Sequence, residues 1–314
     1  MSAKPARAAL ALPADLDMRA MIRPELAGDR ARRIFDGAVS HLELPYATPP
    51  GFRPLVLDLH VPQPRDGAAV PVVIYAHGGG FFAGTRAMGP WAFLLAAGYA
   101  VASVDYRLSG ECTFPGPVHD VAAAVRWIRS RAGEYGLDPG HVIGFGSSAG
   151  AYLVNAVALA GDDHPELTGG LGPAPGLSSR LAAVIDHYAP SDFLTFDDDA
   201  HPGIMEPANA PGTSAARFLG FVPADRPADA ERANLCRYVS TASPPFLIAH
   251  GDDDHRVGIG QSRRLHAALT GAGARAELVV IHGADHGSPE FDQQPLQDKT
   301  LAFLASVVQT GVPR

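Results

Sequence analysis

The sequence is poor in the features that mark several large classes of protein. Its 314 residues contain only two cysteines, Cys112 and Cys236, which are too few for a disulfide framework and are typical of a reducing compartment. No apolar run approaches the roughly 20 residues of a membrane-spanning helix, and the formal net charge of −8 leaves no basic excess for nucleic acid. We therefore expect a cytoplasmic protein that binds neither membrane nor nucleic acid.

Motifs for metals and nucleotide cofactors are also missing. No glycine-rich dinucleotide fingerprint follows a predicted strand, no P-loop sequence occurs, and no H-E-x-x-H or cysteine-bearing spacing marks a zinc site. Histidines and aspartates do gather near two predicted strand ends, at 250–255 and 282–286. A metal site is the less favoured interpretation of these residues, because no metal-ligand spacing accompanies them. We expect no cofactor and no metal.

What the sequence has instead is an alternation of strand-like and helix-like segments from residue 55 onward. Short aliphatic runs bounded by turn residues predict strands, and apolar residues at helical spacing predict the helices between them. The strands are expected at 55–62, 71–79, 98–107, 141–146, 181–190, 244–251 and 275–283, and the helices at 91–97, 119–136, 148–161, 261–273 and 299–309. This order is typical of an α/β domain with a mostly parallel sheet and helices on both faces.

Two segments do not fit this alternation. Residues 1–54 precede the first clear strand, and residues 191–243 are rich in Pro, Asp and Ala with only patchy helical signal. A long irregular insertion within a compact domain is often functional, for example as a lid. At the start, Lys4 and Arg7 precede a short apolar run that Pro13 interrupts, so an N-terminal arm is favoured over a signal peptide.

Two adjacent serines stand in the stretch GFGSSAGAY, and one of them fits the pattern of a nucleophile. The motif G-x-S-x-G places a reactive serine on a sharp turn between strand and helix, with glycines that keep side chains away from it. Gly146 and Gly150 flank Ser148 in this way, whereas Ser147 has no such glycines. Ser148 is therefore the candidate nucleophile. Ala149, at the start of the predicted helix, is a candidate donor of a backbone N–H to an oxyanion.

A glycine-rich turn, HGGGFFAG, directly follows a predicted strand. A flexible turn is the simpler interpretation, but glycines at this place also let the backbone approach a substrate carbonyl and turn its N–H groups inward. The position after a strand favours an oxyanion hole, and we predict that Gly79 and Gly80 donate to it. Phe81, Phe82 and Tyr188 are candidate walls of an apolar substrate pocket.

An acid and a base should follow the nucleophile along the chain. The predicted strand 244–251 is followed by GDDDHRV, whose aspartates lie where sites in open α/β sheets are found. Periodicity does not separate Asp254 from Asp252, and Asp254 is preferred. His282 is expected at the next strand end and His286 in the loop beyond it. His286 is therefore the candidate general base, with the aspartate setting its tautomer.

With these residues in hand, the chain resembles the hormone-sensitive-lipase-like esterases of the α/β-hydrolase fold, and most closely the bacterial carboxylesterases of the BD-FAE group. The resemblance runs from about residue 55 to the end and rests on co-linear motifs. They are HGGGF, DYRLSGECTFPGPVHDVAAAVRWIR, YGLDPGHV, GSSAG, PPFLIAHGDDDHRV and GADHG. The family's H-G-x-x-D-x-x-V arrangement begins at His250 and selects Asp254 as the acid. Its GADHG histidine falls on His286.

The resemblance implies an α/β-hydrolase domain at 55–314, interrupted by a cap insertion at 191–243, with residues 1–54 contributing to the cap. It implies a serine carboxylic-ester hydrolase that forms an acyl-enzyme on Ser148 and acts on small to medium apolar esters without a cofactor. A homodimer is expected on resemblance alone. Two alternatives stay open. One is another acyl-transfer enzyme (amidase or formamidase, thioesterase, lactonase or biosynthetic acyltransferase), and the other is an inert hydrolase-fold protein that binds a small molecule.

Two positions depart from the family's usual elbow, which reads G-D-S-A-G and is often followed by glycine. Ser147 replaces the acidic residue, and Ala151 stands where the glycine is common. Neither belongs to the predicted triad, so the difference bears on substrate preference. Arg107 in DYRL and Asp120 after FPGPVH are interpreted as a structural ion pair rather than as catalytic groups.

Overall fold

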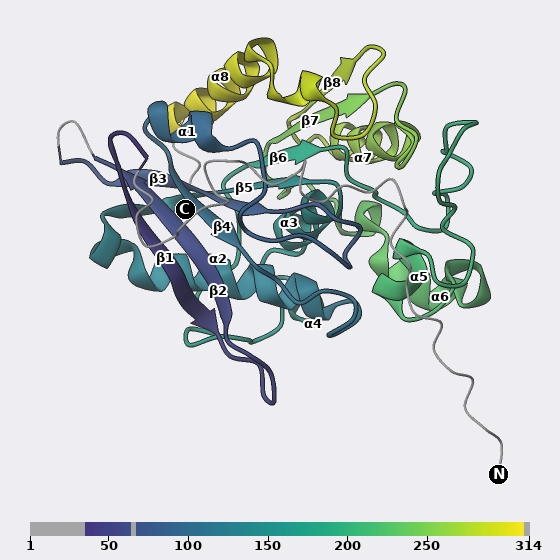
Figure 1. Cartoon of the computed structure of the whole chain (residues 1–314), viewed down its shortest axis with the longest axis horizontal. Coiled ribbons are helices and arrows are strands. Elements are labelled where there is room, and N and C mark those ends of the chain that lie inside the picture. The colour runs from purple at the N-terminus through teal and green to yellow at the C-terminus, as the bar shows by residue number, and fades with distance from the viewer. Residues whose placement is uncertain (1–34, 64–66, 311–314) are drawn as a thin grey trace.

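A single twisted sheet organises the computed structural model, which describes residues 35–63 and 67–310 (Figure 1). Eight strands lie in the spatial order β1-β2-β4-β3-β5-β6-β7-β8. Their bounds are β1 (Ala38–Ala47), β2 (Leu55–Pro62), β3 (Val70–Ala76), β4 (Ala100–Val104), β5 (Leu137–Ser147), β6 (Val184–His187), β7 (Phe246–Gly251) and β8 (Ala276–Ile281). The pairs β1–β2 and β2–β4 are antiparallel, and the pairs from β4–β3 to β7–β8 are parallel.

Helices cover both faces of the sheet (Figure 1). They are α1 (Ala92–Ala96), α2 (Gly116–Tyr135), α3 (Ala149–Ala160), α4 (Pro165–Thr168), α5 (Ser214–Leu219), α6 (Pro227–Ala230), α7 (Gly260–Gly271) and α8 (Gln294–Thr310). Successive residues of a strand face opposite sides of the sheet. Ile74 of β3 therefore joins the core under α2, α3 and α7, and Val73 joins the core under α1 and α8. Burial on both faces explains why the parallel strands are continuous apolar runs.

The alternation predicted from residue 55 onward is confirmed. The seven expected strands correspond to β2 through β8, and the five expected helices to α1, α2, α3, α7 and α8. The boundaries differ in places: β6 is shorter than the expected 181–190, and α8 begins at Gln294 rather than at residue 299. The parallel part of the sheet brings the carboxyl ends of β3, β5, β6 and β7 to one edge, where the predicted site residues follow.

The sheet begins earlier in the chain than the sequence predicts. Residues 38–47 form β1, an edge strand paired with β2, so the expectation that 1–54 contributes to a cap does not hold for β1. The register of β1 shifts at two places, and Glu43 adopts a φ of 57°. Such irregularities, together with Pro45, disrupt the period-two pattern by which a strand is recognised. Residues 1–34, with the predicted N-terminal arm, lie outside the described residues.

The segment 191–243 is irregular, as predicted. Besides α5 and α6 it holds the 3-10 turns η3 (Pro223–Asp225), η4 (Glu231–Ala233) and η5 (Leu235–Tyr238). Figure 1 shows α5 and α6 together at one end of the molecule, opposite β1. Phe218 of α5 stacks on Phe81 with ring centroids 3.9 Å apart, which attaches the insertion to the glycine-rich loop. No helix in the described part of the chain is long and apolar enough to cross a membrane.

Candidate active site

The turn between β5 and α3 holds Ser148 in a strained conformation. Its φ is 54° and its ψ is −121°, values that a non-glycine residue rarely adopts. The flanking glycines are required by close packing: a Cβ on Gly146 would lie 2.4 Å from the nitrogen of Ala151, and one on Gly150 would lie 2.1 Å from the carbonyl oxygen of Ala76. The two glycines of the motif are therefore needed because no larger residue would fit at either position. The turn projects Ser148 above the end of the sheet.

Two further side chains complete a hydrogen-bonded series with Ser148. Nε2 of His286 lies 2.9 Å from the serine Oγ, and Nδ1 of the same ring lies 2.7 Å from Oδ2 of Asp254. The carboxylate accepts the Nδ1 proton, so Nε2 is the unprotonated nitrogen and accepts the hydroxyl proton of Ser148. The structure brings together the three residues that the sequence predicts as nucleophile, base and acid. Asp252, the other candidate acid, pairs instead with the exposed His282.

Asp254 is fully buried and surrounded by hydrogen-bond donors. Backbone N–H groups of Arg256 and Val257 both donate to its Oδ1 at 2.8 Å, and Nε2 of His250 lies 3.2 Å from its Oδ2. Burial opposes ionisation, but the charge of His286 and the hydrogen bonds from both histidines hold the pKa of Asp254 well below its usual range. Asp254 is therefore a fixed negative charge beside His286 at neutral pH.

The glycine-rich loop lies directly against the elbow. A Cβ on Gly78 would be 3.4 Å from Cβ of Ser148, and Gly79 and Gly80 adopt positive φ values of 121° and 59°. The carbonyl of Gly79 accepts from the N–H groups of Phe82 and Ala83 inside the loop. Ala149 is the first residue of α3, and the first N–H groups of a helix have no partner within it. The loop and the start of α3 thus lie next to Ser148, and an oxyanion hole made by Gly79, Gly80 and Ala149 stays a prediction.

The three predicted pocket residues differ in their surroundings. Phe81 is buried in an aromatic cluster with Tyr152, Phe193 and Phe218. Phe82 is partly exposed, and its ring lies over Gly80. The ring of Tyr188 is 4.5 Å from that of His286, and its backbone is held at a φ of 49°. Tyr188 thus lies beside His286 and Phe82 lies over the glycine-rich loop, whereas Phe81 attaches that loop to the insertion. Contact of any of the three with substrate stays a prediction.

Three other residues bear on the predictions. Arg107 donates to both carboxylate oxygens of the buried Asp120, so their interpretation as a structural ion pair is confirmed. His201, which sequence reasoning missed, lies in the insertion with its Nε2 3.3 Å from Oδ1 of Asp253. No sequence motif indicates this contact, because His201 and Asp253 are 52 positions apart in the chain.

Comparison with known proteins places this arrangement in a family. The BD-FAE family model matches residues 57–269, which is more than half of the chain. The chain belongs to the BD-FAE family. Its curated relatives include esterases LipQ and LipI of Mycobacterium tuberculosis. LipQ is 32% identical over 252 residues, covering 77% of this chain and 56% of LipQ, and LipI is 33% identical over 233 residues, covering 71% and 68%.

Solved structures agree with the BD-FAE assignment. A truncated form of a carbohydrate esterase from gut microbiota superposes with a TM-score of 0.77 at 28% identity, covering 86% of this chain and 96% of that one. The predicted α/β-hydrolase fold is therefore confirmed. The chain spans little more than half the length of LipQ and of several other curated relatives.

Proposed function

We propose that this BD-FAE protein hydrolyses carboxylic esters through an acyl-enzyme on Ser148. The observation that supports the proposal most directly is the hydrogen-bonded series from Ser148 through His286 to Asp254, with the glycine-rich loop packed against Ser148. A serine hydroxyl is a weak nucleophile until such a base activates it. The relatives named esterases are consistent with this chemistry, and an inert binding protein has no need of a complete triad.

The proposed mechanism assigns one role to each group. Ser148 Oγ attacks the ester carbonyl while Nε2 of His286 takes its proton, and the N–H groups of Gly79, Gly80 and Ala149 stabilise the tetrahedral oxyanion. His286 then returns the proton to the departing alcohol, which leaves the acyl group on Ser148. A water molecule, deprotonated by His286, releases the acid. Asp254 holds the ring in the required tautomer and stabilises the imidazolium as it forms.

We propose further that the insertion 191–243 acts as a cap and contributes to substrate choice. A Cβ on Gly80 would lie 2.9 Å from Oγ of Ser214 in α5, so the insertion reaches the oxyanion loop. Oγ of Ser214 donates to the exposed carboxylate of Glu206 at 2.5 Å, which puts polar groups beside the loop. Small to medium esters remain the expected substrates. The polar groups and the carbohydrate esterase neighbour add acylated sugars to those that deserve testing.

The deciding experiment is hydrolysis of p-nitrophenyl esters from acetate to laurate, and of an acetylated xyloside, by the wild-type protein and by Ser148→Ala. We expect turnover of the short esters and a loss of more than about 10⁴-fold in kcat for Ser148→Ala, because the nucleophile is gone. Reaction with a fluorophosphonate followed by intact mass measurement should add one label to the wild type and none to the variant.

Ser147→Ala is the matched control, since it removes the adjacent hydroxyl, which accepts a hydrogen bond from Tyr75 at 3.1 Å. We expect this variant to retain both labelling and turnover. Wild-type protein that labels but hydrolyses no ester would redirect the proposal to an amide, thioester or lactone, which matched substrates distinguish. Protein that does not label would contradict the mechanism. The homodimer also stays a proposal, for which light scattering is the test.

A further inference from the structure

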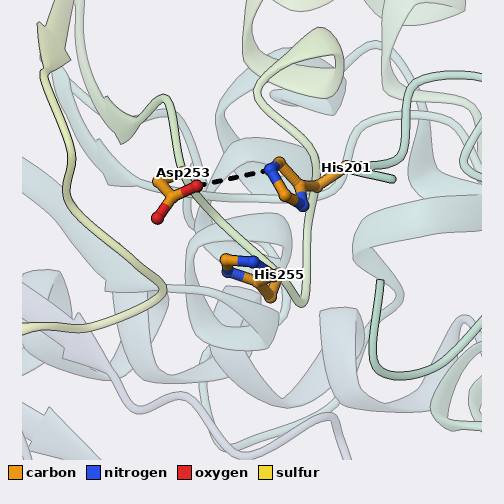
Figure 2. A group of neighbouring side chains, drawn as sticks. All are labelled: His201, Asp253 and His255. Carbon is orange, nitrogen blue, oxygen red and sulfur yellow. Dashed lines mark ion pairs between the residues drawn. The ribbon is translucent and has the colours of Figure 1, made fainter. Parts of the chain in front are cut away.

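Two histidines and an aspartate gather at the junction between the insertion and the loop that holds the catalytic acid. They are His201, Asp253 and His255, whose ligand atoms all lie within 4.8 Å of one another (Figure 2). We propose that these three side chains bind one Zn²⁺ ion, with water as the fourth ligand. The sequence predicts no metal, because His201 is remote from the other two and matches no known ligand spacing.

The geometry is close to that of a bound ion. Nε2 of His201 and Oδ1 of Asp253 are 3.3 Å apart. Two ligands at about 2.0 Å from a tetrahedral zinc ion are themselves separated by about 3.3 Å. The His201 and His255 rings lie side by side, with centroids 4.1 Å apart and an interplanar angle of 55°. The other donor–donor separations are at most 4.8 Å, so closing them to the spacing of zinc ligands takes up to about 1.5 Å.

The donor set and its surroundings suit a divalent transition metal. Two imidazoles with one carboxylate leave a coordination position for water, the composition of many open zinc sites. Nδ1 of His255 lies 3.4 Å from Oδ1 of Asp285, so a carboxylate orients one ligand ring from outside. Asp253 is about half exposed, at 53%, which gives the ion a path from solvent.

One contact opposes metal binding and limits the affinity. The backbone N–H of Gly203 donates to Nδ1 of His201 at 3.0 Å, so in the metal-free protein the ring proton is on Nε2 and faces Asp253. An ion on Nε2 requires that proton to move to Nδ1, where it would meet the Gly203 hydrogen. The turn at 201–203 must therefore open slightly. We expect weaker binding than at a closed structural zinc site.

Binding at this place would fasten the insertion to the catalytic loop. His201 comes from the insertion, whereas Asp253 and His255 flank the catalytic acid, Asp254. Oδ1 of Asp285 accepts from the backbone N–H groups of both His255 and His286, at 2.9 and 2.7 Å. A continuous set of contacts thus leads from the proposed ion to the catalytic base. The ion is assigned no chemical step, and its effect is to hold the cap and the loop together.

The test uses the full chain, stripped with a chelator and titrated with Zn²⁺ alone by calorimetry, with bound zinc counted by mass spectrometry. We expect one ion per chain and a rise in Tm of about 4 °C at a hundredfold excess over Kd, because the ion binds only the folded state. His201→Gln and Asp253→Asn should each weaken binding at least tenfold and abolish most of the shift in Tm.

His282→Gln is the matched control, since His282 also pairs with an aspartate near the same loop but lies outside the cluster. It should bind zinc as the wild type does. Circular dichroism of the metal-free variants checks that they are folded, which we expect because His201 and Asp253 are partly exposed. Wild-type protein that binds no zinc, variants that bind it undiminished, or equal loss in His282→Gln would each overturn the proposal. None of these outcomes depends on esterase activity.

Discussion

Among the aspartates and histidines at the carboxyl ends of β6 to β8, Asp254 with His286 and Asp186 with His187 form a contrast, because only the first of these two pairs is hydrogen-bonded. Asp254 and His286 are 32 residues apart in the chain and meet at 2.7 Å. Asp186 and His187 are consecutive residues of β6, so their side chains point to opposite faces of the sheet. Asp186 pairs with Asn155 of α3, whereas His187 packs among aromatic rings. Adjacent positions in a strand thus keep Asp186 and His187 apart, whereas the fold brings Asp254 and His286 together although they are distant in sequence.

The comparison also shows that burial alone does not decide charge. Both aspartates are almost completely inaccessible to solvent. Two histidines and two backbone N–H groups face Asp254, and its pKa is held low against the effect of burial. Asp186 has two neutral donors, Asn155 Nδ2 at 2.7 Å and the Ala189 N–H at 3.0 Å, and burial raises its pKa to about 6. The number and charge of the donors decide which carboxylate stays ionised.

The largest expected effect comes from breaking the hydrogen-bonded pair. Asp254→Asn should lower kcat for a short ester by about 10³–10⁴-fold, because an amide at this position favours the wrong tautomer of His286. Ester kinetics at pH 7 measure this directly, with fluorophosphonate labelling to report residual nucleophilicity. Asp252→Asn is the control, since Asp252 lies outside the triad, and it should keep near-normal kinetics. Equal losses in both variants would show that the loop was disturbed rather than the base.

The next largest effect is expected at His187 and concerns the dependence of stability on pH. In contrast to His286, its two ring nitrogens have no hydrogen-bond partner among the described residues. Burial lowers the pKa of His187 to about 3, so between pH 6.5 and 3 the unfolded chain binds a proton that the folded protein does not. Stability must fall as pH falls through this window. His187→Phe removes the titrating group and with it this loss of stability. Between pH 7 and pH 3 to 4 the free energy of unfolding should therefore fall by about 3–5 kcal/mol less in the variant than in the wild type.

Urea unfolding at several pH values measures that difference. His266→Gln, at a partly exposed histidine of α7, is the control and should leave the acid branch of the stability curve close to that of the wild type. If His187→Phe loses stability as steeply as the wild type below pH 6, the ring of His187 has a partner in solution and the contrast with His286 fails.

A smaller effect of opposite sign is expected at Asp186. A folded-state pKa of about 6 against 3.8 unfolded means that the folded protein binds more protons in this window, so stability falls as pH rises across it. Asp186→Asn should remove this decline, which amounts to about 2–3 kcal/mol in the free energy of unfolding as pH rises from about 4 to 7. Oδ1 of Asn155 has no partner among the described residues, so a flipped Asn155 amide can accept from the new amide group.

The same urea series at pH 4 to 8 tests this prediction, and activity at pH 7 checks that the neighbouring elbow is intact. In the wild type the effects of Asp186 and His187 on stability partly cancel between pH 4 and 6. Each single variant therefore shows the pH dependence of the residue that remains. The double variant should show the flattest dependence on pH. An Asp186→Asn variant that is unstable at every pH would indicate that the charge of Asp186 is needed for folding.

The hydrogen-bonded series of Ser148, His286 and Asp254 could be predicted largely from local patterns, although only the family resemblance separated Asp254 from Asp252. Glycines around Ser148 reflect sterics within one turn, and Asp254 and His286 follow strands whose order along the chain is diagnostic. The edge strand β1 was not predictable, because its bulge and Pro45 interrupt the alternation. The burial of Phe81 depends on Phe218, which is brought to it from the insertion. His201 likewise meets Asp253 only through the fold, and no pattern of neighbouring residues encodes such a contact.

The hydrogen bond between Ser148 and His286 spans 138 residues of sequence, and this has a consequence for synthesis. The strand, turn and helix that hold the serine are complete by residue 160, whereas the base follows the last strand of the sheet. A chain that stops in between would present an exposed elbow whose serine is an ordinary alcohol. The proposed hydrolysis therefore requires the chain beyond residue 286, and a premature stop codon anywhere upstream would remove the proposed base.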